Sequence, residues 1–137
     1  MKPDGSLVSP LSEISFNVWN VSPDGTELIG YVWNDREERG GVAVLPTTGG
    51  APRLLESVFP LAEHFFSFTP DGAWVTYMRQ QNGQWNVYGR PRGGGPERQI
   101  TRFADNMQIF ATAWSRDGRL AVSRGTGMSD VVLITSK

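Results

Sequence analysis

The hydrophobic positions of this chain form short stretches rich in aromatic and β-branched residues, each bounded by Gly, Pro, Asp or Asn. None shows a convincing helical periodicity. Stretches of this composition, bracketed by turn residues, predict short strands joined by hairpins. The longest apolar runs have about five residues, too few for a membrane-spanning segment. The pattern therefore predicts an all-β chain.

The turns between these stretches recur at a constant spacing. Asp-Gly turns in similar settings occupy residues 21–25, 68–72 and 114–118, and their glycines are 47 and 46 residues apart. A second landmark, a Pro followed by a Gly-Gly turn, occupies residues 46–50 and returns 45 residues later at 91–95. Two independent landmarks with almost the same period indicate an internal repeat.

Each period contains four strand candidates, two on either side of a turn. The first strands are residues 17–21, 65–68 and 109–114, and the second are 27–33, 74–78 and 120–123. The third strands are residues 42–45, 85–88 and 131–134, and the fourth are 53–55 and 98–100. Four strands in about 40–50 residues are typical of a blade of a β-propeller.

The repeat resembles a known family. Phe-Thr-Pro-Asp-Gly at 68–72, Trp-Ser-Arg-Asp-Gly at 114–118 and the Gly-Gly-x-x-Arg-x-Ile-Thr ending at 94–101 are similar to the TolB-like propeller repeat, which belongs to the wider WD-type propellers. The resemblance covers essentially the whole chain and implies a ring of six blades. Such repeats occur in translocation proteins, in accessory propellers of serine peptidases and in sensor domains of bacterial kinases or regulators. The chain departs from the repeat at Arg116, where proline is expected.

The strand count predicts one domain, residues 1–137, containing three blades. Residues 14–56 form the first blade, 57–101 the second, and 102–137 a third that lacks its fourth strand. The missing strand is expected from residues 1–13, as in the closure of other propeller rings. Three blades are too few for a ring, since propellers have about 4–8. We therefore expect a homodimer that closes a six-bladed ring, because an open arc would expose apolar blade faces and an unpaired strand edge.

Composition excludes several classes of function. Thirteen basic and fourteen acidic residues give a net charge of −1, which argues against binding of nucleic acid or of a membrane surface. The absence of Cys excludes a disulfide scaffold, a thiolate zinc site and a cysteine nucleophile, but leaves the compartment open. No signal peptide is recognised at the N-terminus, and the family resemblance fits a cytoplasmic or an extracytoplasmic location.

The residues that could carry chemistry have simpler explanations. His64 is the single histidine, which argues against a metal site and against a Ser-His-Asp triad, so a structural role is favoured for it. Asp24, Asp71 and Asp117 each precede a glycine at a hairpin tip, where Asp bonds the local backbone and Gly provides positive φ. We therefore expect no enzyme activity and no cofactor.

Two functions remain open. The chain is either a non-catalytic module that binds a protein, peptide or small molecule, possibly as a sensor, or a fragment of a propeller that gates access to a serine peptidase. Ligand contact is expected at the loops before the first strands and between the second and third strands, because variable loops on a rigid scaffold usually carry recognition. The candidate residues are Arg36, Glu38, His64, Phe65, Gln81, Asn106, Gln108 and Met128. The opposite mouth, with its tight turns, is expected to offer little room.

Overall fold

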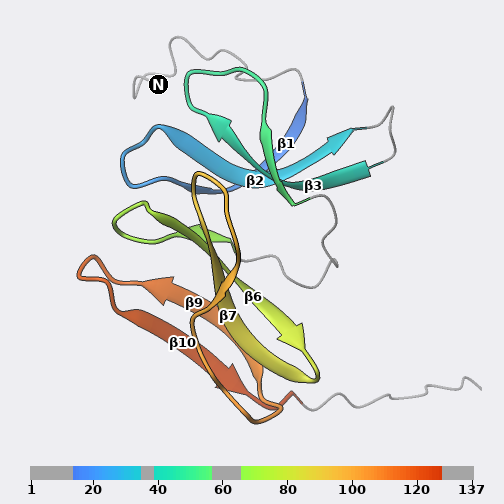
Figure 1. Ribbon diagram of the computed structural model, residues 1–137, viewed down its shortest axis with the longest axis vertical. Helices are drawn as coiled ribbons and strands as arrows, with labels where there is room; N and C mark the ends of the chain where they lie inside the picture. Colours follow the sequence, from blue (N-terminus) through green and yellow to red (C-terminus); the bar gives the residue numbers. More distant parts are fainter. Residues whose placement is uncertain (1–13, 35–38, 57–65, 128–137) are drawn as a thin grey trace, which may run out of the picture.

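The computed structural model describes residues 14–34, 39–56 and 66–127. All regular elements in these ranges are β-strands, in three antiparallel sheets stacked one against the next (Figure 1). In the same ranges, no helix has the length and hydrophobicity needed to cross a membrane. The prediction of an all-β chain is therefore confirmed for the described residues.

The first two sheets each have four strands that follow one another in chain order. Sheet 1 contains β1 (Ser15–Val21), β2 (Glu27–Asn34), β3 (Arg39–Pro46) and β4 (Arg53–Glu56). Sheet 2 contains β5 (Ser67–Phe68), β6 (Trp74–Gln81), β7 (Gln84–Pro91) and β8 (Arg98–Gln99). The third unit, hairpin 3, contains β9 (Gln108–Trp114) and β10 (Leu120–Gly125).

The predicted first and second strands are present in all three repeats, and the third and fourth strands in the first two. The first strand of the second repeat is shorter than predicted, because β5 begins at Ser67. The expected strand at 131–134 and the expected closing strand in residues 1–13 lie outside the described residues. The predicted blade boundaries and the ring closure therefore stay predictions.

The Asp-Gly turns have the structural role predicted for them. The Asp24 carboxylate accepts bonds from the Ser22 hydroxyl, 2.7 Å, and from the Thr26 amide, 3.0 Å. Gly25 has a φ of +71°, and the two equivalent glycines have φ values of +68° and +83°, which only glycine adopts without strain. Because each aspartate is bonded within its own turn, a structural role explains its spacing.

The third Asp-Gly turn is one residue shorter than the other two. In each turn a Ser or Thr hydroxyl accepts a bond from the backbone amide that starts the next strand. The donors are Glu27, Trp74 and Arg119, which follow Ser22, Thr69 and Ser115 by five, five and four residues.

The shorter turn preserves the side of the sheet on which the apolar residues lie. Phe68 pairs with Val75 in sheet 2, and Trp114 pairs with Leu120 in hairpin 3. Leu120 and Val122 consequently pack against sheet 2. Side chains alternate between the two faces of a strand, so a turn of the usual length would have reversed both faces of β10.

The core lies between the sheets. Ile29, Val42 and Val44 of sheet 1 pack against apolar and aromatic residues of sheet 2. The Phe66 ring stacks on Trp19 with a centroid separation of 5.1 Å and on Tyr77 with a separation of 5.0 Å. This face-to-face packing of four-stranded sheets is the arrangement of neighbouring propeller blades.

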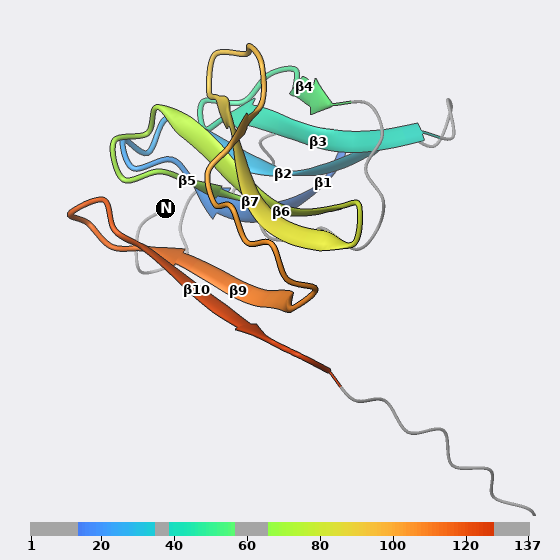
Figure 2. The ribbon, with the colours of Figure 1, turned by 60° about the horizontal axis from the view of Figure 1, so that its bottom comes forward.

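Sheet 2 packs on hairpin 3 through a second apolar cluster and a buried amide. Met78 and Val87 contact Ile109, Leu120 and Val122. The side chain of Asn86 is bonded to the connection between β8 and β9, donating to the Phe103 carbonyl at 3.1 Å and accepting from its amide at 2.7 Å. Figure 2 shows this connection running from sheet 2 to the outer hairpin.

Candidate functional site

Two hollows lie beside the Asp-Gly turns, and we call them together the turn-face hollow. The first has a volume of about 250 Å3 and is lined by Pro23, Phe68, Pro70, Trp114, Ser115 and Arg116. The second has a volume of about 540 Å3 and is lined by Thr69, Pro70, Asp71, Trp114, Arg116, Asp117 and Gly118. Pro70, Trp114 and Arg116 line both.

The repeat itself assembles this hollow. Successive sheets place equivalent turns side by side, so Pro23, Pro70 and Arg116 occupy the same position in three consecutive turns. Phe68 and Trp114 end the first strands of the second and third repeats. The indole Nε1 of Trp114 donates to the Thr76 hydroxyl at 3.0 Å, which fixes the ring that forms the shared wall.

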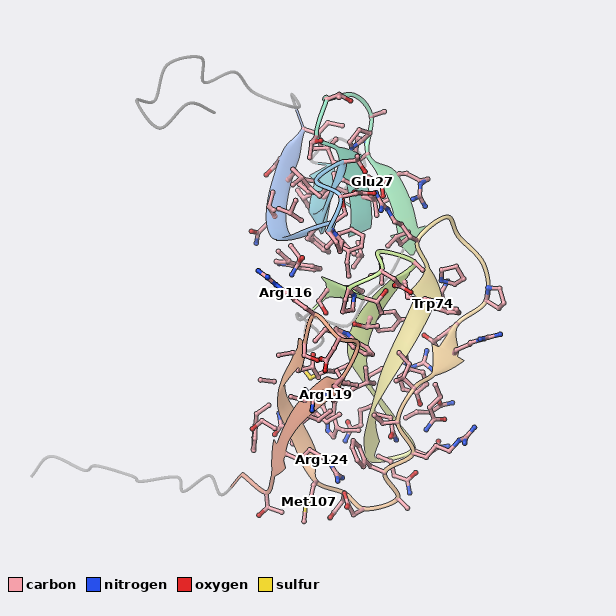
Figure 3. All side chains as sticks on the ribbon, turned by 90° about the vertical axis from the view of Figure 1, so that its left-hand side faces the viewer. Glu27, Trp74, Met107, Arg116, Arg119 and Arg124 are labelled. Carbon is pink, nitrogen blue, oxygen red and sulfur yellow. The ribbon has the colours of Figure 1, made fainter. Side chains whose placement is uncertain are left out.

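Arg116 is the uncommitted charge of the turn-face hollow. The structure gives it no ion pair or hydrogen bond with any residue in the described part of the chain, and it is exposed. Figure 3 shows its side chain extending outward from the end of hairpin 3. A guanidinium presents five donors in a planar fork, a geometry that fits a carboxylate.

The two aspartates of the hollow already have partners. The Thr69 hydroxyl donates to Asp71 at 2.6 Å, and this bond is the main reason that the pKa of Asp71 lies below its usual value. The Ser115 hydroxyl similarly lowers the pKa of Asp117, which also forms an ion pair with Arg119 at 2.8 Å. Both carboxylates are therefore ionised at neutral pH and held within the third and second turns.

A second arginine beside the hollow is fully engaged. Arg92, at the turn after β7, donates to the Asp24 carboxylate at 2.8 Å and to the Thr26 hydroxyl at 2.6 Å, and it also pairs with Glu27. Arg92 is the largest cause of the strongly lowered pKa of Asp24. The group joins sheet 1 to sheet 2, so Arg92 has a structural role that Arg116 lacks.

The structure describes only part of the predicted ligand loops. Gln81 ends β6, Gln108 begins β9 and Asn106 precedes it; all three are exposed. The Gln81 carbonyl oxygen accepts from the Arg79 guanidinium and from the Tyr88 hydroxyl, each at 3.2 Å. Arg36, Glu38, His64, Phe65 and Met128 lie outside the described residues. The proposed role of these eight side chains stays a prediction.

The two hollows lie at the opposite ends of the strands from Gln81 and Gln108. The face with the Asp-Gly turns was expected to have little room, and the structure corrects this, because both hollows form between neighbouring turns rather than within one. The departure of Arg116 from the repeat was the sequence signal for this site. Among the described residues, no three His, Cys, Asp or Glu side chains lie close enough together to hold a metal ion.

No protein-family model matches the chain. An uncharacterized protein of Agrobacterium fabrum is 32% identical over 87 residues, which are 62% of this chain and 28% of that protein. A solved protein of Agrobacterium tumefaciens assigned as TolB matches with a TM-score of 0.53 and 23% identity, over 76% of this chain and 40% of its own. TolB from Acinetobacter baumannii matches with a TM-score of 0.57 and 19% identity, over 78% and 26% of the two chains.

The structural likeness establishes a TolB-like fold, built from antiparallel sheets of the β-propeller type. The chain spans 28% of its curated relative and 40% and 26% of the two solved chains. It therefore corresponds to a part of these larger proteins.

Proposed function

We propose that this chain is half of a six-bladed TolB-like propeller and that it binds a protein or peptide partner without catalysis. The observation that carries the proposal is Arg116, a cation without a partner among the described residues, in a hollow that also presents the Trp114 ring. An aromatic wall beside a guanidinium suits a peptide with an acidic side chain and an apolar neighbour.

The rest of the hollow supports recognition rather than chemistry. Its other charged residues, Asp71 and Asp117, are bonded to hydroxyls of their own turns and are not placed as an acid and base pair. The hollow is wide and open, and its walls come from three turns, as expected for a segment of a macromolecule. A sensor role and a role as a peptidase gate have no specific observation to support them, so the proposal is limited to binding.

Selection of peptides from a random heptapeptide library on the intact chain tests the proposal. We expect the selected peptides to contain Asp or Glu. Arg116→Ala should weaken their binding roughly tenfold or more, since hydrogen bonds to charged groups contribute about 1.5–3 kcal/mol. Arg102→Ala is the matched control, because Arg102 is exposed and does not line the hollow.

A second variant and a site map complete the test. Arg116→Pro installs the residue that the two preceding turns carry, so it removes the charge with little cost to the backbone. The indole N–H signal of Trp114 should shift when an acidic peptide binds. Equal binding to the wild type and Arg116→Ala, or amide shifts confined to Gln81, Asn106 and Gln108, would exclude the turn-face hollow and favour the opposite mouth.

A further inference from the structure

The outward side of β1 is exposed where the equivalent part of sheet 2 is buried. Val21 is 50% exposed and Val18 is 47% exposed. Phe68, which occupies the position of Val21 one repeat later, is 6% exposed because it packs against sheet 1. We call Val18, Val21 and their neighbour Leu28 the β1 face. It has the position of a blade face with no preceding blade.

The outward side of hairpin 3 shows the complementary feature. Ala113, Ala121 and Ser123 are exposed there, and we call them the hairpin face. The one-residue-shorter turn makes Ala121 and Ser123 the structural equivalents of Thr76 and Met78, which are 1% and 2% exposed in sheet 2. Thr76 is covered by Trp114 of the next unit. The hairpin face therefore has the position of a blade face with no following blade.

These two faces match by the rule that governs both internal contacts. Sheet 1 meets sheet 2, and sheet 2 meets hairpin 3, always through the side of Ile29 or Thr76 on one unit and the side of Phe68 or Trp114 on the next. By the same rule, the hairpin face would meet the β1 face. Neither face contains a charged residue, and depletion of charge is typical of interface cores.

We infer that the hairpin face of one chain packs on the β1 face of a second copy, and the reverse, so that two chains close one ring. Three units cannot bring their own ends together, because propeller rings need about 4–8 blades, whereas two copies provide six. The small side chains of Ala121 and Ser123 leave room for Val18 and Val21. The dimer has twofold symmetry and two equivalent contacts. This inference rests on the proposed half-propeller.

Light scattering after size exclusion, at about 10–100 μM chain, measures the assembly. We expect the mass of two chains for the wild type and of one chain for Ala121→Glu and Val21→Glu, with at least a tenfold weaker association. Ala73→Glu is the matched control, because Ala73 is exposed on the turn of sheet 2 and belongs to neither face. It should keep the mass of two chains.

Mixing the two variants gives a sharper result. A pair made of one Ala121→Glu chain and one Val21→Glu chain has one contact with both substitutions and one contact with none. We therefore expect an equimolar mixture to recover part of the two-chain mass. Two chains joined by a symmetric Val21-to-Val21 contact would gain nothing from mixing.

Several results would overturn the inference. They are a single-chain mass for the wild type at 100 μM, masses that grow beyond two chains with concentration, or an Ala121→Glu chain that associates like the wild type. Circular dichroism checks that each variant is folded, and Ala121→Glu decides if Val21→Glu is not, because Ala121 is exposed. Peptide binding to Arg116 is measured on the Ala121→Glu chain as well, so that a failed dimer and a failed binding site give different results.

Discussion

Replacement of Asn86 by alanine should uncouple hairpin 3 from sheet 2. The Asn86 side chain is 2% exposed and is the point at which β7 holds the connection to β9. Its amide oxygen accepts from the Phe103 amide at 2.7 Å and from the Thr101 hydroxyl at 2.9 Å, and its nitrogen donates to the Phe103 carbonyl at 3.1 Å. The Arg124 guanidinium stacks on the Phe103 ring, 3.4 Å from its centroid. The contact of the connection with hairpin 3 therefore depends on the same residue.

The expected cost follows from the groups left unpaired. Asn86→Ala removes three hydrogen bonds and leaves the amide and carbonyl of the partly buried Phe103 without their partner. A buried polar group that loses its partner costs about 1–3 kcal/mol. Two such groups, one of them partly reached by water, give a loss of about 3 kcal/mol in the free energy of unfolding. With a urea m-value of roughly 2 kcal/mol/M for a chain of this size, the midpoint should fall by about 1.5 M.

Urea unfolding at a fixed chain concentration is the assay, because any association of chains adds to the apparent stability. Asn106→Ala is the matched control, since Asn106 is exposed beside the same connection. It should change the free energy of unfolding by less than about 0.5 kcal/mol. Hydrogen exchange should also accelerate at the Phe103 amide in Asn86→Ala. If Asn86→Ala and Asn106→Ala unfold at the same urea concentration, the reasoning about this anchor is refuted.

Two further predictions concern sheet 1. Gly30→Ala should destabilise the chain by at least about 2 kcal/mol, because an added Cβ would lie 2.0 Å from the Asn17 carbonyl oxygen; Gly93→Ala, which meets nothing within 4 Å, is the control, and equal melting temperatures would contradict the prediction. The pKa of Asp24 lies far below its usual 3.8, chiefly because of Arg92, so its ionised form contributes stability above about pH 4 that is lost as the pH falls. Asp24→Asn should therefore lower the melting temperature at pH 7, and the difference from the wild type should shrink between pH 5 and pH 2; a difference that is constant with pH would show that the carboxylate charge has no part in it.

Local turn chemistry made the strands predictable. A Ser or Thr hydroxyl, an aspartate and a glycine close each turn within a few residues, so the pattern has the same local effect at 22–25 and at 69–72. The third strands were harder to delimit, because β3 and β7 extend beyond their apolar centres into Arg39 and Gln84. There the backbone pairing with the preceding strand, and not side-chain burial, sets the end of the strand.

The candidate site was predicted less well than the strands. The deviation of Arg116 from the repeat was visible, but nothing local shows whether an exposed arginine has a partner. Arg92 and Arg116 are both next to turns, yet Arg92 reaches Asp24, 68 residues earlier in the chain, and Arg116 reaches no described residue. Loop length and variety favoured the opposite mouth, whereas the hollows come from the spacing between neighbouring turns.

The sequence by itself determined the strand positions, the turn geometry and the repeat, because each depends on hydrogen bonds and φ values within a few residues. It also contained the shortened third turn, whose effect on alternation follows from the two-residue period of a strand. Only the tertiary structure decided which faces are covered: Phe68 and Val21 occupy the same place in the repeat, and one is buried while the other is half exposed. Burial depends on what packs against a residue, and its neighbours across the sheet stack come from a different repeat.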